Sequence, residues 1–172
     1  MAKIWLLVVA ALFWASGGMA AERIEVGGLA FAVPEGWRVL PPGSPMRKAE
    51  LQAPGGGGVT FFHFGRQQGG TAEANIERWI RQFQEPPEVL QPRREVKRLG
   101  AIVVHHFRAS GTYLSGMPGG PTTPQPGHSL VAAAIEGPEG NVFVRLVGPD
   151  AATLPLEAAF RRMIEDAAQT TR

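Results

Sequence analysis

Two strand-length apolar runs lie close together towards the C-terminal end of the sequence. They cover Leu130–Ile135 and Val142–Val147, and a short segment of glycine, proline, asparagine and glutamate separates them. Runs of this length on either side of such a segment predict an antiparallel hairpin. Residues 131–135 carry no polar side chain, so this strand should be covered on both faces, as central strands are. We therefore expect the hairpin to form the middle of a β-sheet.

Shorter runs with strand character fill much of the remaining sequence. They cover Arg23–Val26, Leu29–Val33, Trp37–Leu40, Met46–Ala53, Val59–Phe64, Val96–Leu99 and Ala101–Ala109. Glycines and prolines separate most neighbouring runs, as is typical of antiparallel strands joined by turns. Within Met46–Ala53, alternation predicts that Arg47, Ala49 and Leu51 share one face.

Two segments have the spacing of an amphipathic helix. The first follows Thr71, which can cap a helix, and ends before Pro86-Pro87. The second lies near the C-terminus. Apolar residues at helical spacing are Ile76, Trp79, Ile80 and Phe83 in the first segment, and Leu156, Ala159, Phe160, Met163, Ile164 and Ala167 in the second. Neither stripe is stable in water, so each helix should lie on the sheet. The elements predict an α+β fold with a central antiparallel sheet of about seven strands and two helices packed on it.

The segment Ser115–His128 interrupts this pattern. Eight of its fourteen residues are glycine or proline. Proline lacks the N–H that a strand uses in its ladder. The sequence therefore predicts a long loop here that does not join the sheet.

The N-terminus has the features of a secretory signal peptide. A short basic start precedes an unbroken apolar run, Ile4–Ala15, and small residues follow up to Ala20. We expect residues 1–20 to be removed, which leaves 21–172 as a single α+β domain in the periplasm or outside the cell. The alternative is an uncleaved membrane anchor, but the run has twelve residues and a spanning helix needs about 20. No transmembrane span is expected after signal removal.

Composition and charge narrow the function further. The sequence has no cysteine, which excludes disulfides and thiolate metal sites. Its net charge is only +2. Its densest basic cluster is Arg93, Arg94, Lys97 and Arg98. On one strand these side chains divide between two faces, whereas nucleic-acid binding needs a single basic surface. We interpret the cluster as a solvated strand edge and expect no nucleic-acid partner.

The histidines are the residues from which an enzyme site could be built. His105 and His106 are adjacent, so on a strand they point to opposite faces and cannot hold one metal ion together. His63 could meet one of them across neighbouring strands, but no carboxylate stands at a recognisable metal-ligand spacing. We expect no catalytic residue, metal or cofactor. The alternative is a metal-dependent or hydrolytic enzyme that uses these histidines.

A set of polar and aromatic residues is a candidate binding site. Its members are Arg47, Lys48, Glu50, Asn75, Trp79 and Tyr113. They could rim a groove for a ligand or partner, with the predicted loop 115–128 as a lid. In the alternative interpretation, Trp79 belongs to the core and the charges keep an edge strand from pairing with other molecules.

Several short motifs stand out along the mature chain. They are Gly36-Trp37, the segment 44–50, the segment 75–79 with Gln82-Phe83, Gly111-Thr112-Tyr113 and Gly148-Pro149. Together they resemble a group of uncharacterised secreted bacterial proteins. The order of elements is also similar to the PsbP-like α/β/α sandwich, the fold of an accessory protein of photosystem II. That resemblance implies a central antiparallel sheet with helices on both faces, and it implies no chemistry. We therefore predict a secreted, non-enzymatic domain that binds an unknown envelope protein or a small ligand.

Overall fold

Seven strands form one antiparallel sheet in the computed structural model, which describes residues 22–116 and 120–171. They are β3 (Arg38–Leu40), β4 (Arg47–Gln52), β5 (Gly58–His63), β6 (Arg93–Leu99), β7 (Ile102–Gly116), β8 (Thr122–Gly137) and β9 (Gly140–Pro149). Their order across the sheet is β3-β4-β5-β9-β8-β7-β6, and every neighbouring pair is antiparallel. This confirms the predicted α+β fold. The predicted signal peptide, residues 1–20, lies outside the described residues.

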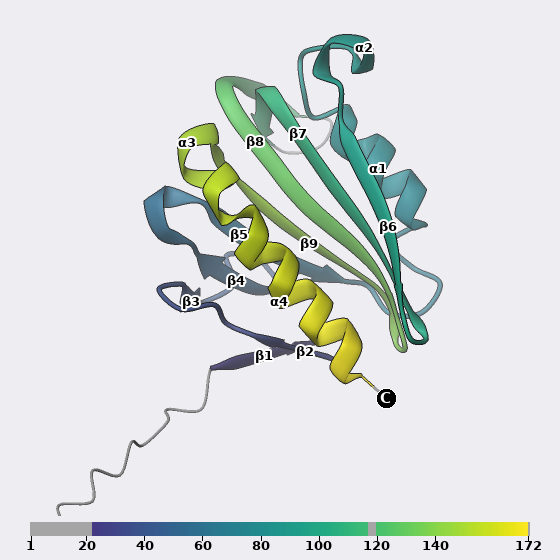
Figure 1. Cartoon of the computed structure of the whole chain (residues 1–172). Helices are drawn as coiled ribbons and strands as arrows, with labels where there is room; N and C mark the ends of the chain where they lie inside the picture. The colour runs from purple at the N-terminus through teal and green to yellow at the C-terminus, as the bar shows by residue number, and fades with distance from the viewer. Residues whose placement is uncertain (1–21, 117–119, 172) are drawn as a thin grey trace, which may run out of the picture.

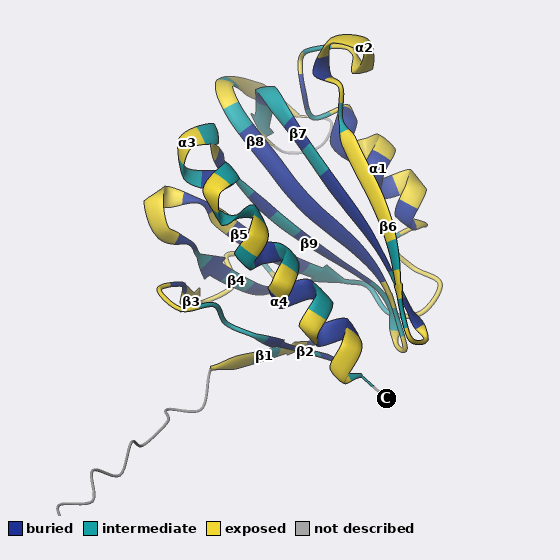
Figure 2. Cartoon of the chain, in the orientation of Figure 1, coloured by how far each residue is buried: buried dark blue, intermediate teal, exposed yellow. Residues whose placement is uncertain are grey.

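The predicted hairpin lies in the middle of this sheet. β8 and β9 pair along their whole shared length, and β8 lies between β9 and β7. The apolar run Val131–Ile135 of β8 is buried throughout, which Figure 2 shows as a continuous dark-blue stretch. Alternate residues of this run contact the cores on opposite faces of the sheet. The expectation of a strand covered on both faces is confirmed.

One face of the sheet carries the C-terminal helix and an N-terminal hairpin. The hairpin pairs β1 (Arg23–Val26) with β2 (Leu29–Ala32), and the helical segment contains α3 (Asp150–Thr153), a 3-10 turn (Leu154–Leu156) and α4 (Glu157–Thr170). α4 lies diagonally across the sheet, and its C-terminal end lies beside β2 (Figure 1). Phe160, Met163 and Ile164 of α4 are buried with Leu29 and Phe31 of the hairpin. We call this the α4 face.

The opposite face carries a shorter helix, α1 (Ala72–Ile80), followed by α2 (Pro87–Leu90). The Thr71 hydroxyl accepts a hydrogen bond from the Ala74 N–H at 3.1 Å, which confirms the predicted cap. Trp79 lies with its ring centroid 5.7 Å from that of Phe107 and 6.5 Å from that of Phe143. α1 therefore covers β7, β8 and β9 on what we call the α1 face. None of the helices in the described part of the chain is long and apolar enough to cross a membrane.

The prediction of a loop at Ser115–His128 is wrong. β7 continues to Gly116 and β8 begins at Thr122, and the two strands pair out to this end. The pairing of β8 with β9 stops at His128, so among the described strands the earlier part of β8 pairs with β7 alone. A proline is tolerated on such an edge where its missing N–H faces solvent. Pro124 and Pro126 are two residues apart, which places them on the same side of the strand.

Candidate functional site

An open groove lies on the part of the α1 face that α1 does not cover. It has a volume of about 360 Å³, within the range of small-ligand sites, roughly 300–1,000 Å³. We call it the sheet groove. It is lined by residues of five strands: β3, β4, β5, β7 and β9. The lining side chains include Leu40, Arg47, Glu50, Phe62, Tyr113 and Arg145.

Arg145 is the charged residue of an otherwise apolar stretch of β9 and lines the sheet groove. Its guanidinium donates to Gln82 Oε1 at 2.8 Å and to the hydroxyl of Tyr113. Both acceptors are neutral, and among the described residues no carboxylate forms an ion pair with Arg145. Its Nε is buried and has no hydrogen-bond partner within the described ranges. The groove therefore contains a positive charge that the described part of the chain leaves uncompensated.

Tyr113 is held in place by the segment that follows α1. The Leu114 N–H donates to the Gln82 carbonyl at 2.7 Å, and the Gln84 N–H donates to the Thr112 carbonyl at 2.9 Å. The rings of Phe83 and Tyr113 meet edge to face with centroids 5.5 Å apart. These contacts fix the hydroxyl that faces Arg145, since a packed ring and a paired backbone leave Tyr113 little freedom.

A carboxylate fixes the backbone just before Tyr113. Both oxygens of Glu85 accept the Thr112 N–H at 2.9 Å, at the position where the register of β7 and β8 shifts. Hydrogen bonds from Thr112 hold the pKa of Glu85 below its ordinary value. The ionised carboxylate therefore stabilises the irregular backbone at this end of the groove.

Arg47 and Glu50 form the rim of the sheet groove on β4. Their side chains form an ion pair of 3.1 Å, and Glu50 also accepts the Gly43 N–H. The sequence predicted Arg47 on the face of Ala49 and Leu51, and this is wrong. A register shift between Arg47 and Ala49 inserts one extra residue, which moves Arg47 to the opposite face.

The other predicted site residues do not join this groove. Trp79 is buried in the core, as the alternative interpretation had it. Asn75 is also buried, and its amide donates to the carbonyls of Gly69 and Thr71 at 2.8 and 2.9 Å, so it anchors the start of α1. Lys48 is exposed and lines a separate hollow beside His63. Of the predicted set, the structure brings together Arg47, Glu50 and Tyr113.

The histidines are too far apart for the shared site of the enzyme alternative. Two strands, β9 and β8, lie between the strand of His63 and that of His105 and His106, a separation of about 14 Å. His105 lies 2.8 Å from Glu136 and faces α1, whereas His106 lies 3.1 Å from Glu165 of α4. The predicted split between two faces is confirmed. Within residues 22–116 and 120–171, no group of three or more His, Asp or Glu side chains could hold a metal ion.

Comparison with known proteins supports the fold. No family model matches the sequence, and no curated protein resembles it closely enough to indicate a relationship. The structure is similar to the solution structure of the cyanobacterial PsbP protein CyanoP from Synechocystis sp. PCC 6803, with a TM-score of 0.56 and 12% sequence identity. The match covers 87% of this chain and 92% of CyanoP. The chain therefore has a PsbP-like fold, as the order of its elements implied.

Proposed function

We propose that this chain is an exported cell-envelope protein that binds a ligand or a partner segment in the sheet groove and does not catalyse a reaction. The groove is lined by side chains from several strands, with fixed aromatic and polar groups beside apolar ones. Sites for small ligands have this composition. The PsbP-like fold alone supports no particular ligand, because one fold carries many functions.

Arg145 carries the proposal. A guanidinium that is partly removed from water and has no carboxylate partner costs free energy, and this one is held by the neutral groups of Gln82 and Tyr113. An acidic group on a ligand would compensate its charge. Phe62 and Val147 line the groove beside it, so the ligand should present an apolar portion next to its acidic group.

Site-specific photo-cross-linking in intact cells of the source organism tests the groove. A benzoyl-phenylalanine at Ser115, which lines the sheet groove, should give a discrete adduct under illumination. The same residue at Arg162, which is exposed on α4, is the matched control. Arg145→Gln should abolish the Ser115 adduct while the purified variant still unfolds cooperatively. Equal adducts from both positions, or an adduct that survives Arg145→Gln, would rule out a specific site at this groove.

Export is tested separately from binding. The mature protein should begin near Ala21, because small residues precede that position after an apolar run. Intact mass measurement on the protein released from the periplasm or the medium should show loss of residues 1–20. Full-length protein retained in the membrane fraction would instead indicate an uncleaved anchor.

A further inference from the structure

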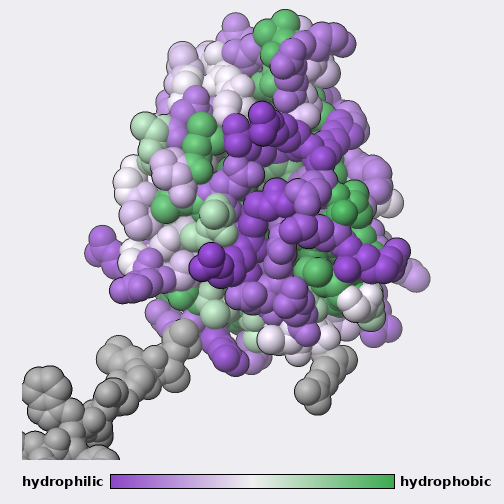
Figure 3. Space-filling view, viewed as in Figure 1, coloured by the Kyte–Doolittle hydropathy of each residue, from purple (hydrophilic) through white to green (hydrophobic). Residues whose placement is uncertain are grey.

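A second groove lies on the α4 face, between α4 and the edge of the sheet formed by β6 and β7. It has a volume of about 410 Å³, and Figure 3 shows hydrophilic residues gathered over this part of the surface. We call it the arginine groove. Its lining includes Arg93, Glu95, His106, Arg108, Glu157 and Arg161. It lies on the opposite face of the sheet from the sheet groove.

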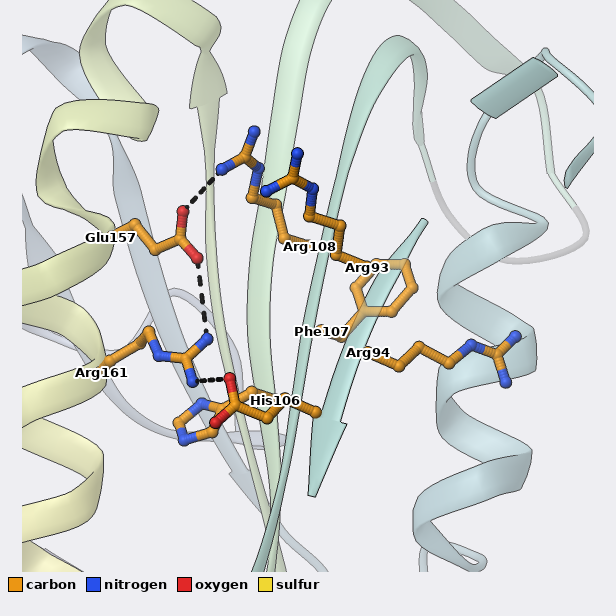
Figure 4. A pocket seen from close by; sticks show the side chains of 8 residues that line it. Arg93, Arg94, His106, Phe107, Arg108, Glu157 and Arg161 are labelled. Atoms are coloured by element: carbon orange, nitrogen blue, oxygen red, sulfur yellow. Dashed lines mark hydrogen bonds and ion pairs between the residues drawn. The ribbon is translucent and has the colours of Figure 1, made fainter. Parts of the chain in front are cut away.

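Two arginines stand directly opposite each other in this groove. Arg93 of β6 is the cross-strand partner of Arg108 of β7. Figure 4 shows the two side chains lying alongside each other, while Arg94 points away towards α1. Like charges in directly opposite positions of an antiparallel pair destabilise it. Arg93 is exposed to solvent, and a negative charge bound between the two guanidiniums would relieve their repulsion.

The described carboxylates compensate only part of this charge. Glu157 of α4 lies 2.9 Å from Arg108 and 3.8 Å from Arg161. Arg161 also pairs with Glu95 of β6. Arg93 forms no ion pair with any residue in the described part of the chain. The positive charge in excess therefore lies on the Arg93 side of the groove.

His106 adds an unpaired polar group to the floor of the groove. It is 3% exposed, and neither ring nitrogen has a hydrogen-bond partner among the described residues. Its Nε2 lies 3.1 Å from a carboxylate oxygen of Glu165, but the two atoms do not have the geometry of a hydrogen bond. Burial lowers the pKa of His106 to about 4, so at neutral pH the ring is uncharged and has one N–H to donate. A buried donor without an acceptor is costly.

We propose that the arginine groove binds a phosphate group between the guanidiniums of Arg93 and Arg108, with Arg161 and His106 at its inner side. A phosphate offers more acceptor oxygens than a carboxylate, so it can accept hydrogen bonds from two guanidiniums at once. Arg93 would donate with its whole guanidinium, and Arg108 with the N–H groups that Glu157 does not use. The groove is large enough for the remainder of a phosphate ester. This site is independent of the sheet groove and of its proposed ligand.

The test uses the mature protein and three phosphate sources at one ionic strength, set with sodium chloride. Inorganic phosphate and glycerol 3-phosphate are titrated by calorimetry, and vesicles of phosphatidylglycerol are tested by co-sedimentation. We expect saturable binding in at least one arm and a weakening of at least tenfold in Arg93→Gln. The matched control is Arg98→Gln, which removes the same charge from the same strand at a position five residues further on and outside the groove. The arm that binds most tightly identifies the source of the phosphate.

A second measurement separates binding from general damage. In phosphate-free buffer, Arg93→Gln should unfold at the same temperature as the wild type or at a higher one, because it removes repulsion from Arg108. Added phosphate should raise the unfolding temperature of the wild type and of Arg98→Gln, and leave that of Arg93→Gln unchanged. Equal responses in all three proteins, or no binding in any arm, would overturn the proposal.

Discussion

The two faces of the sheet differ in how far they are covered, and the same strands show the difference. On β5, Val59 and Phe61 are buried on the α4 face, while Thr60 and Phe62 point into the sheet groove. β9 repeats this pattern, with Val144 and Leu146 buried and Arg145 and Val147 in the groove. On these two strands the 14-residue α4 and the β1–β2 hairpin complete the cover of one face, whereas the nine-residue α1 leaves part of the other uncovered. Where cover is missing, the strands carry polar and partly exposed residues.

The largest expected effect is on the covered face. Phe160→Ala removes a fully buried ring that packs between α4 and the sheet. Such a truncation leaves a cavity and should lower the free energy of unfolding by about 3–5 kcal/mol. Chemical denaturation followed by tryptophan fluorescence measures the change.

The matched substitution on the open part of the other face is Phe62→Ala. Phe62 is only partly buried and lines the sheet groove, so less apolar area is lost from the core. We expect a cost of at most about half that of Phe160→Ala, since the cost of truncation scales with buried area and with the cavity left behind. Equal costs at the two positions would contradict the difference between the faces.

The next prediction concerns how the free energy of unfolding depends on pH, and the residue responsible, His106, lies on the α4 face. Burial lowers the pKa of His106 from 6.5 to about 4, so between these values the unfolded chain binds a proton that the folded chain does not. Stability therefore falls as the pH falls below 6.5, by up to about 1.4 kcal/mol per pH unit. The groups around His106 are Glu95 and Lys97 of β6 and Arg161 and Glu165 of α4.

Denaturation at pH 6.5 and pH 5 measures this slope above the range in which carboxylates titrate. In His106→Leu the slope should largely disappear, because leucine has no group that binds a proton. The substitution should be tolerated, because the His106 ring has no hydrogen-bond partner among the described residues. His128→Gln is the control and should keep the slope, since His128 lies outside this groove. A wild-type slope that survives in His106→Leu would show that another group is responsible.

Local patterns predicted most of the fold, and long-range context decided what they missed. The apolar run of β8, the α1 stripe and the cap at Thr71 are visible in sequence because neighbouring residues determine them. The strands at Ser115–His128 were missed since glycine and proline oppose a central strand. Because β9 ends at Pro149, the first part of β8 does not pair with it and forms an edge of the sheet. Prolines are tolerated at such an edge.

Long-range context also decides which residues meet at the candidate site, so the sequence pointed to some of them and not to others. Tyr113 and Arg47 both line the sheet groove, but Arg47 does so through a bulge that sequence alternation does not reveal. Arg145 was missed, although a charge within an apolar strand is a visible signal. Whether that charge meets a helix or an open groove depends on where α1 ends over the sheet, and residues distant in sequence determine that.

A smaller effect is expected at Tyr113. Tyr113→Phe keeps the ring against Phe83 and removes the hydroxyl that contacts Gln82 and Arg145. We expect a loss of about 0.5–1.5 kcal/mol in the free energy of unfolding, the usual contribution of a hydrogen bond. Binding at the sheet groove should weaken as well, because the guanidinium of Arg145 loses one of the groups that orient it. Denaturation and the yield of the Ser115 cross-link measure the two effects, and a variant with normal cross-linking would place Tyr113 outside the binding site.

The smallest effect on stability is expected at the rim. The side chain of Arg47 is 42% exposed where it pairs with Glu50, and surface ion pairs contribute roughly 0–1 kcal/mol. Arg47→Ala should therefore leave the unfolding midpoint nearly unchanged. If the sheet groove accepts an acidic ligand, the same substitution should still lower its association rate and reduce the effect of salt on that rate, because rim charges act mainly on encounter. Lys48→Ala removes the neighbouring charge, which lies outside the groove, and it should change neither quantity. A difference between these two variants in binding, with none in stability, would show that the open face is used for recognition.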